Sequence, residues 1–264
     1  MVVQRYSAEG HQERFAALAR EVVTSEPDLI VMNYNVLARA FQAATSTIPL
    51  VGIVADPVRT GLVPSLARPG GSFTGVSVDA GAGLHGKRLQ LLKELLPSSQ
   101  RIAYLGTPVE WNGPAGQELR AAGSQLGLTV FGVLSEQIGP QELRRLFHDA
   151  IRERAHAAVV SAGGFFLAHR QLIVELAAAN RLPAMYAFRE IIEVGGLAAY
   201  GPDLGEAAER LASQVDQVLK GAKPGDVPVH QASKFALVLN ITTARALGLT
   251  VPPMLLARVD DVIE

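Results

Sequence analysis

Residues that could hold a small ligand stand directly after two apolar runs near the start of this sequence. Asn33, Tyr34 and Asn35 follow the run LIVM, and Asp56 follows the run IPLVGIVA. If these runs are strands of a parallel sheet, the loops after them meet at one edge, where such sheets bind ligands. Amide side chains there can donate hydrogen bonds to a carboxylate, Tyr34 can stack on a flat ligand, and Asp56 can neutralise an ammonium group. The same residue types also cap helices and turns, so both interpretations remain open.

A second set of candidate residues follows apolar runs in the middle of the chain. Thr107 follows RIAYLG, Ser161 ends AAVVS, and Gly163 lies in the glycine pair that comes next. Thr107 and Ser161 precede expected helices, so they either contact a ligand or serve as N-caps. Phe165 is expected to form a wall of the binding site, with the next phenylalanine in the core. Tyr186, near the end of the run AMYAF, has an amphipathic side chain suited to binding.

Several kinds of catalytic and metal chemistry lack their sequence patterns. The chain has no cysteine, and its six histidines show none of the spacings HxxH, HxH or HExxH. No nucleophile elbow and no Walker A loop occurs. The spacing G-x-G-x-x-G does occur from Gly81 to Gly86, but it follows a polar stretch, so we interpret it as a linker into a helix. We therefore expect no metal, no cofactor and no catalysis.

Composition narrows the classes of partner. The chain has 264 residues, of which 48% are hydrophobic, and a formal net charge of −1. This length suffices for two modest domains. Near-neutral charge without a Lys/Arg run disfavours nucleic acid as the main partner. No window approaches the length of a membrane span, and the start MVVQRYSAEG does not resemble a signal peptide.

Apolar runs alternate with amphipathic segments along the whole chain, which predicts an α/β fold with parallel sheets. A typical amphipathic segment is GKRLQLLKELL, whose leucines recur at helical spacing. The expected strands are Val2–Tyr6, Asp28–Asn33, Ile48–Ala55, Phe73–Ser77, Arg101–Leu105, Thr129–Val133, Ala157–Ser161, Ala184–Phe188, Leu197–Tyr200 and Lys234–Leu239.

Two similar strand–helix runs, divided near Pro97–Ser99, predict two lobes. The pair Gly195-Gly196 separates the runs AMYAF and LAAY, so we expect these two strands to lie in different sheets. At this break the chain would return to the first lobe. Lobe 1 is therefore expected to comprise residues 1–98 and 191–224, and lobe 2 residues 99–190 and 225–264.

Three long stretches resemble one protein family. They are SLARPGGSFTGVS followed by GKRLQLLKELLP, then PAMYAFREIIEVGGLAAYGPDL, then the C-terminal stretch from LKGAKPGDVPVHQASKFALVLN to the end. These resemble the ABC-transporter substrate-binding proteins of the tryptophan/tyrosine-binding type. The resemblance implies two Rossmann-like lobes joined by a multi-crossing hinge, the type I periplasmic-binding-protein fold. It also implies an extracytoplasmic location, an ABC permease as membrane partner, and no catalysis.

The chain departs from the family pattern at two places. Family members normally begin with a leader peptide and then a strand and helix before the equivalent of Val2–Tyr6. Lobe 1 is therefore expected to lack its first strand and helix, and its exposed sheet edge would favour a homodimer. Members also more often carry Gly-Thr where Asn33 and Tyr34 stand, so the binding site is expected to differ there.

The leading hypothesis is a solute-binding protein of an ABC importer that closes by hinge motion on a ligand in the inter-lobe cleft. The named loops hold no cluster of Arg or Lys, so a polyanion would be poorly neutralised. An amino acid or an aromatic or apolar carboxylate fits better. The alternative is a ligand-sensing regulatory module on the same fold. A nucleotide-sugar or NAD-dependent enzyme is a third reading, but it needs a phosphate loop and an acid/base pair that the sequence does not clearly offer.

Overall fold

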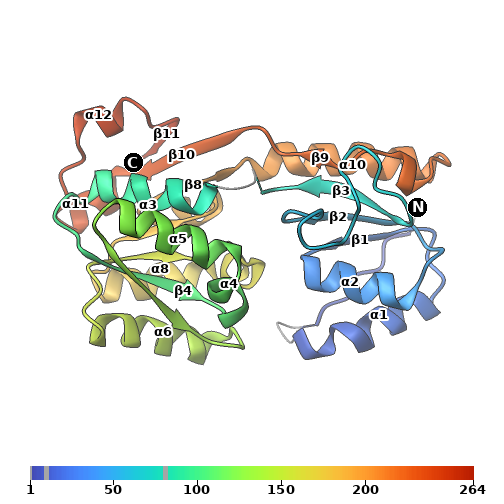
Figure 1. The fold of residues 1–264 in the computed structure, drawn as a ribbon, viewed down its shortest axis with the longest axis horizontal. Helices are drawn as coiled ribbons and strands as arrows, with labels where there is room; N and C mark the ends of the chain where they lie inside the picture. The colour runs from blue at the N-terminus through green and yellow to red at the C-terminus, as the bar shows by residue number, and fades with distance from the viewer. Residues whose placement is uncertain (1, 9–11, 80–82) are drawn as a thin grey trace. The chain divides into compact units, whose positions relative to one another are not determined.

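The computed structural model describes residues 2–8, 12–79 and 83–264, which form an α/β protein with two sheets (Figure 1). The chain divides into two compact units, each built from separate segments. Unit 1 comprises Met1–Gly81 and Leu204–Ser233, and unit 2 comprises Ala82–Asp203 and Lys234–Glu264. The α/β class predicted from alternating apolar and amphipathic segments is confirmed.

Unit 1 is built on a four-stranded parallel sheet with the order β1-β2-β3-β9. Its strands are β1 (Ile30–Asn33), β2 (Leu50–Val54), β3 (Phe73–Ser77) and β9 (His230–Gln231). Its helices are α1 (Phe15–Thr24), which follows the 3-10 turn Gln12–Arg14, α2 (Asn35–Ala44) and α10 (Leu204–Leu219), with a second 3-10 turn at Pro224–Asp226. In Figure 1, α1 and α2 lie on one face of this sheet and α10 on the other.

The core of unit 1 lies between the sheet and the helices α1 and α2. Alternate residues of β1, Ile30 and Met32, are buried there, while Val31 on the opposite face is 54% exposed. Phe41 of α2 and Phe73 of β3 fill the centre of this core. This alternation is what a strand covered on one face requires.

Unit 2 is built on a seven-stranded sheet with the order β11-β10-β8-β7-β6-β4-β5. Its strands are β4 (Arg101–Gly106), β5 (Thr129–Leu134), β6 (Ala157–Val160), β7 (Ala184–Tyr186), β8 (Ala198–Pro202), β10 (Phe235–Asn240) and β11 (Asp261–Ile263). Its helices are α3 (Leu84–Leu95), α4 (Pro108–Asn112), α5 (Pro114–Gln125), α6 (Pro140–Arg152), α7 (Gly164–Ala168), α8 (Arg170–Ala179), α9 (Arg189–Ile192), α11 (Ile241–Ala246) and α12 (Pro253–Leu256). All its strand pairs are parallel except β8 with β10, which is antiparallel.

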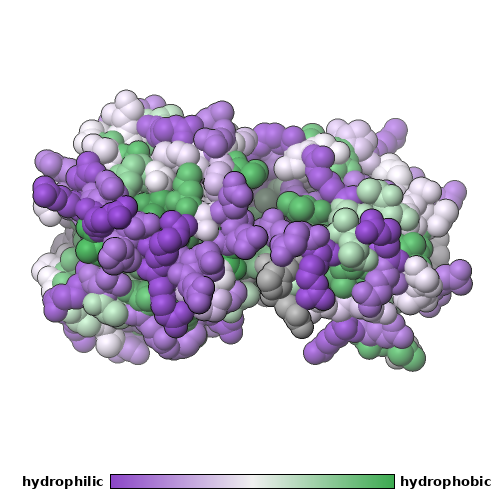
Figure 2. All heavy atoms as spheres, turned by 90° about the horizontal axis from the view of Figure 1, so that it is seen from below, coloured by the Kyte–Doolittle hydropathy of each residue, from purple (hydrophilic) through white to green (hydrophobic). Residues whose placement is uncertain are grey.

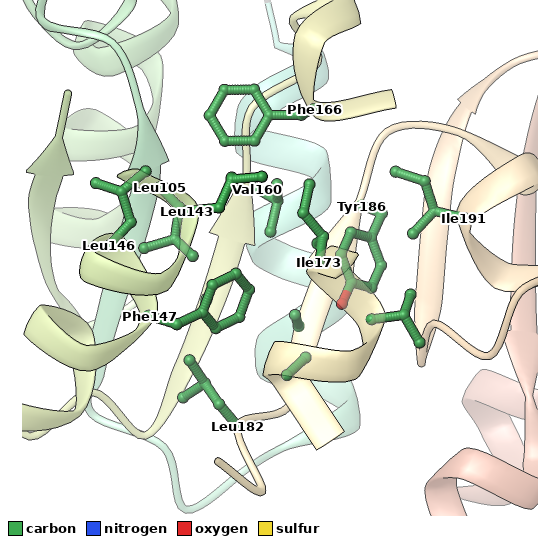
Figure 3. Packing of buried hydrophobic residues seen from close by; sticks show 14 of the residues in the cluster. Leu105, Leu143, Leu146, Phe147, Val160, Phe166, Ile173, Leu182, Tyr186 and Ile191 are labelled. Atoms are coloured by element: carbon green, nitrogen blue, oxygen red, sulfur yellow. The ribbon is translucent and has the colours of Figure 1, made fainter. Parts of the chain in front are cut away.

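Both faces of the unit 2 sheet are covered by helices, so its central strands are apolar throughout. One core cluster joins the sheet to α6 and α8, and Figure 3 shows Phe147, Ile173 and Tyr186 among its side chains. The other joins the sheet to α3 and α5 and includes Leu92 and Tyr104. The strands β4 and β6 are thus packed against core residues on both faces of the sheet, and this packing positions their carboxyl ends.

Three predictions about segments need correction. Residues 2–8 have no regular secondary structure, so the expected strand Val2–Tyr6 is absent. The strands on either side of Gly195-Gly196 lie in the same sheet, because β7 and β8 pair directly in parallel. The sequence predicts that the glycine pair marks a crossing between the lobes. In the structure the glycine pair instead follows α9 and leads into β8.

The bounds of the two units also differ from the expected lobes. Residues 82–98 and 191–203 belong to unit 2, since α3 packs on β7 and β8, and β8 pairs with β7 and β10. Residues 225–233 belong to unit 1, where β9 pairs with β3. Part of the G-x-G-x-x-G stretch, including Gly81, lies outside the described residues.

The surface drawn in Figure 2 is mainly hydrophilic, with hydrophobic residues in small separate patches. Among the described residues, no helix combines the length and apolar character needed to cross a bilayer.

Candidate functional site

A network of hydrogen bonds at the carboxyl end of β4 centres on Glu110. Thr107 is the N-cap of α4, and its hydroxyl oxygen accepts from the backbone N–H of Glu110 at 3.3 Å. In return, Glu110 Oε2 accepts from the backbone N–H and the hydroxyl of Thr107, both at 2.9 Å. This is a capping box, in which cap and carboxylate satisfy each other.

The carboxyl end of β6 joins the same network. Ser161 is buried, and its hydroxyl donates to Glu110 Oε1 at 2.6 Å while accepting from the N–H of Gly163 at 2.8 Å. A Cβ on Gly163 would lie 3.1 Å from Ser161 Oγ and 3.2 Å from Glu110 Oε1, so a larger residue would press on this pair. We call Thr107, Glu110, Ser161 and Gly163 the Glu110 cluster.

Aromatic and basic side chains surround the Glu110 cluster. Tyr104 is a buried neighbour of the cluster, and burial, followed by the charge of Glu110, raises the pKa of the tyrosine well above its ordinary value. Trp111 stacks on Tyr104 with ring centroids 5.8 Å apart, and the guanidinium of Arg120 lies 4.7 Å from the Trp111 ring centroid. Arg88 is only 2% exposed and donates to the carbonyl of Tyr200 at 2.7 Å.

The chemistry of the Glu110 cluster follows from counting its donors. An ionised carboxylate accepts about four hydrogen bonds. Here Thr107 supplies two and Ser161 one, and the buried Tyr104 hydroxyl is a further partner of the carboxylate. Thr107, Ser161 and Tyr104 thus hold the carboxylate in place, and its negative charge can attract a donor such as a ligand ammonium group. Because their hydroxyls already donate to the carboxylate, Thr107 and Ser161 position Glu110 rather than offer their protons to a ligand.

The candidate residues of unit 1 lie at the carboxyl ends of β1 and β2. Asn35 joins these ends: its Nδ2 donates to the carbonyl of Ala55 and to Thr60 Oγ1, and its Oδ1 accepts from the N–H of Ala55 at 2.9 Å. Both polar atoms of the Asn35 side chain therefore form hydrogen bonds within unit 1. Asn33, the last residue of β1, is exposed.

Tyr34 has an unusual backbone conformation for a tyrosine. Its φ of 73° with ψ of 134° lies in a region that favours glycine, and it precedes the first residue of α2. Its side chain is half-buried, and this burial raises the pKa of its hydroxyl. Strained backbone of this kind is concentrated at functional sites.

Asp56 also stands at positive φ, at 34°, in the turn that follows β2. Its carboxylate accepts from the N–H of Arg59 at 2.9 Å and pairs with the Arg59 guanidinium at 2.9 Å. Arg59 lies 3.7 Å from Asp79 as well. Asp56 is thus already neutralised within its own turn.

The predicted aromatic contacts of unit 2 occupy different environments. Phe166 is 1% exposed in the core, whereas Phe165 is half-buried. Tyr186 is 1% exposed and lies in the core cluster under α8, where Figure 3 places its ring between Ile173 and Ile191. The structure therefore brings Thr107, Ser161 and Gly163 together and places Tyr186 apart from them.

Sequence reasoning missed two residues around this site. Glu110 stands three residues after Thr107, and the pattern Thr-x-x-Glu before a helix is the sequence signature of a capping box. That signal could have identified it. Arg88 looks like an exposed residue of an amphipathic helix, and its burial against Tyr200 depends on a contact 112 positions away.

Comparisons with known proteins identify the family. The sequence model described as "ABC transporter substrate binding protein" matches residues 1–263. A curated relative, the tyrosine-binding protein of Clostridioides difficile, is 24% identical over 88% of this chain; the chain spans 66% of that relative's length.

Solved structures agree with this match. An ABC domain from Streptococcus pneumoniae, solved in complex with L-Trp, is 28% identical with a TM-score of 0.85, over 98% of this chain and 88% of that one. A 5-methylthioribose transporter solute binding protein from Thermotoga lettingae, 13% identical with a TM-score of 0.60 over 95% of this chain and 84% of that one, shares the fold. This is the type I periplasmic-binding fold, as expected. The chain belongs to the family of ABC transporter substrate binding proteins.

Proposed function

We propose that this protein binds an aromatic amino acid and delivers it to the permease of an ABC importer. Membership of the family supports the binding role, and the two relatives above are named for tyrosine or solved with L-Trp. The observation that carries the proposal is the Glu110 cluster, a half-buried carboxylate that Thr107 and Ser161 hold in place by three hydrogen bonds.

The cluster suits the ammonium group of an amino acid. A carboxylate and an ammonium form a charge-assisted hydrogen bond, which is stronger than a neutral one. Because Thr107 and Ser161 hold Glu110 in place, little side-chain entropy is lost when the ligand arrives. Asn33, Tyr34 and Phe165 remain predicted ligand contacts. Asn35 and Asp56 are predicted to shape the loops, since their polar groups are used within unit 1.

The remaining parts of the proposal follow from the family. We propose that the protein works outside the cytoplasm with a membrane permease as partner and catalyses no reaction. The expectation that two lobes enclose the ligand by a hinge motion stays a prediction.

A thermal-shift panel tests the ligand class. The panel comprises L-tryptophan, L-tyrosine, tryptamine, indole-3-propionate and citrate. At a concentration one hundred times its Kd, an aromatic amino acid should raise Tm by about 5–10 °C. Tryptamine, which keeps the ammonium, should retain part of the shift, and indole-3-propionate, which lacks it, should lose most. A larger shift with indole-3-propionate than with tryptamine would contradict the role of Glu110, and a shift with citrate alone would contradict the ligand class.

A further inference from the structure

Unit 2 contains a cavity at the opposite end of its strands from the Glu110 cluster. The cavity has a volume of about 230 Å³ and lies between α8, the start of β7, the loop before β8, and α11. It opens at the amino ends of β7 and β8, whereas the Glu110 cluster stands at the carboxyl ends of β4 and β6. Most of its wall is apolar, including Val174, Leu197 and Leu247.

The hydroxyl of Tyr186 is the unusual feature of this cavity. Tyr186 is 1% exposed and lines the cavity, and none of the described residues forms a hydrogen bond with its hydroxyl. Leu182, which precedes β7 and is labelled in Figure 3, also lines the cavity. Because this hydroxyl of Tyr186 keeps some accessible surface and its residue lines the cavity, it can donate a hydrogen bond to a ligand there.

A basic residue, Arg181, is among those that line the same cavity. It is exposed and forms no ion pair or side-chain hydrogen bond with any described residue. The cavity therefore combines an apolar wall, a hydroxyl donor and a guanidinium, and it holds no acidic side chain in its lining. This combination selects a small anion with an apolar body.

The loop before β8 keeps the cavity open. Thr243 Oγ1 donates to the carbonyl of Gly195 at 2.9 Å and ties this loop to α11. A Cβ on Gly196 would lie 3.0 Å from the ring of Tyr186, so glycine leaves room beside the tyrosine. An apolar cavity of about 150 Å³ is enough to bind benzene. The larger volume here accommodates a molecule the size of hexanoate.

We propose that this cavity binds a small monocarboxylate with an apolar body, whose carboxylate accepts hydrogen bonds from Arg181 and the Tyr186 hydroxyl. The site is independent of the proposed amino-acid site. Occupation would stabilise the packing of α8 and α11 on the sheet.

Amide chemical shifts measured by NMR during a titration with sodium hexanoate test this proposal. Saturable shifts are expected at Gly195, Gly196 and Thr243. Hexanamide, the neutral isostere, should bind more weakly. Arg181→Gln should weaken hexanoate binding about two- to fivefold, the effect of a partly exposed charged contact, and affect hexanamide less. Tyr186→Phe should weaken both ligands, because the carboxylate and the amide carbonyl each accept from the hydroxyl.

Two controls sharpen the result. Arg154→Gln is matched to Arg181→Gln, because both arginines are exposed, follow a long helix and have positive φ, at 57° and 48°. It should have no effect. Ala177→Leu fills the cavity from α8 and should abolish hexanoate binding.

Other outcomes would overturn the proposal. These are no saturable shifts at the three cavity amides, equal affinity for hexanoate and hexanamide, or unchanged hexanoate binding in Ala177→Leu. Shifts confined to Thr107, Ser161 and Gly163 would place hexanoate at the Glu110 cluster and overturn the second site alone. Shifts that L-tryptophan causes at Thr107 and Ser161 report on the proposed function separately, so either idea can fail without the other.

Discussion

At the scale of single residues, Glu110 determines how the strand-end hydroxyls are used. Thr107 and Ser161 were candidates for ligand contacts or for helix caps, and their hydroxyl protons go to Glu110. Replacing Glu110 by a neutral residue of the same shape should therefore lower both the ligand affinity and the free energy of unfolding. Hydrogen bonds from Thr107 and Ser161 to this carboxylate make it a direct test of the cluster.

Glu110→Gln tests this role. We expect the affinity for an aromatic amino acid to fall at least tenfold, because the ammonium loses a charged partner. The free energy of unfolding should fall by about 1–2 kcal/mol, since a neutral amide accepts weaker hydrogen bonds and places an N–H₂ group against a donor. Calorimetry and urea denaturation measure the two effects. Glu136→Gln, at an exposed position, is the matched control. Wild-type affinity in Glu110→Gln would remove this residue from the binding site.

Backbone strain at Tyr34 gives a second prediction. At most positions alanine is more stable than glycine by about 0.4–1 kcal/mol. At a φ of 73° the order should reverse, so Tyr34→Gly should be more stable than Tyr34→Ala by about 1 kcal/mol. Comparing the two variants by thermal or urea denaturation cancels the loss of the ring. The usual order would show that the backbone relaxes on substitution.

Some of these residue roles could be read from sequence and others could not. The positions of Thr107, Ser161 and Gly163 after strands are local features, and the structure brings them together. The orientation of Tyr186 is not local, because its side chain turns toward α8 and the amino ends of the strands. The ion pair between Asp56 and Arg59 forms because the turn after β2 brings the two side chains together.

At the scale of elements, most strands follow directly from apolar runs. The predictions around β2, β3, β4 and β5 agree with the structure to within a few residues. The short strands β9 and β11 have two and three residues and no periodic pattern, so nothing local marks them. The pairing of β7 with β8, and the antiparallel pairing of β8 with β10, depend on contacts between distant segments.

The short helix α9 carries a testable titration. Burial raises the pKa of Glu190, and its Oε2 is buried without a hydrogen-bond partner among the described residues. The folded state therefore holds the proton more tightly than the unfolded state. Its contribution to stability is present at low pH and is lost as pH rises through the carboxyl range and up to the raised pKa.

Glu190→Gln should accordingly be more stable than the wild type near neutral pH, by about 0.5–1 kcal/mol, the scale of a partly exposed charge. The difference should vanish at a pH below the ordinary carboxyl pKa, where Glu190 is protonated in both states. Urea denaturation across this pH range measures it. Glu209→Gln, on the exposed face of α10, is the matched control. A constant difference at all pH values would contradict the assignment.

At the scale of the whole molecule, the alternation of strands and helices predicted two sheets, but not which segments join them. The helix α3 was assigned to lobe 1 because it precedes the break at Pro97–Ser99. Its leucines pack instead on the sheet of unit 2, with Tyr104 and Met185. Sequence order groups α3 with the segments that precede it. The apolar face of α3 packs instead on the sheet that offers it a complementary apolar surface.

The exposed edge of unit 1 keeps the homodimer as a prediction. Among the described residues, β1 pairs on one side only, with β2, and its Val31 is 54% exposed. A second copy could pair along this edge. Sedimentation velocity should detect a dimer at micromolar concentration, and Val31→Lys should shift it toward monomer, since charged residues protect sheet edges. A wild-type monomer at all concentrations would contradict this prediction.

Titration calorimetry of the purified protein with L-tryptophan and L-tyrosine tests the central claim most directly. We predict one site per chain for at least one of them, with a Kd at or below about 1 µM, which corresponds to about −8 kcal/mol. The same titration with indole-3-propionate should give at least tenfold weaker binding. No heat of binding with either amino acid, or equal affinity for the analogue without the ammonium group, would contradict the claim.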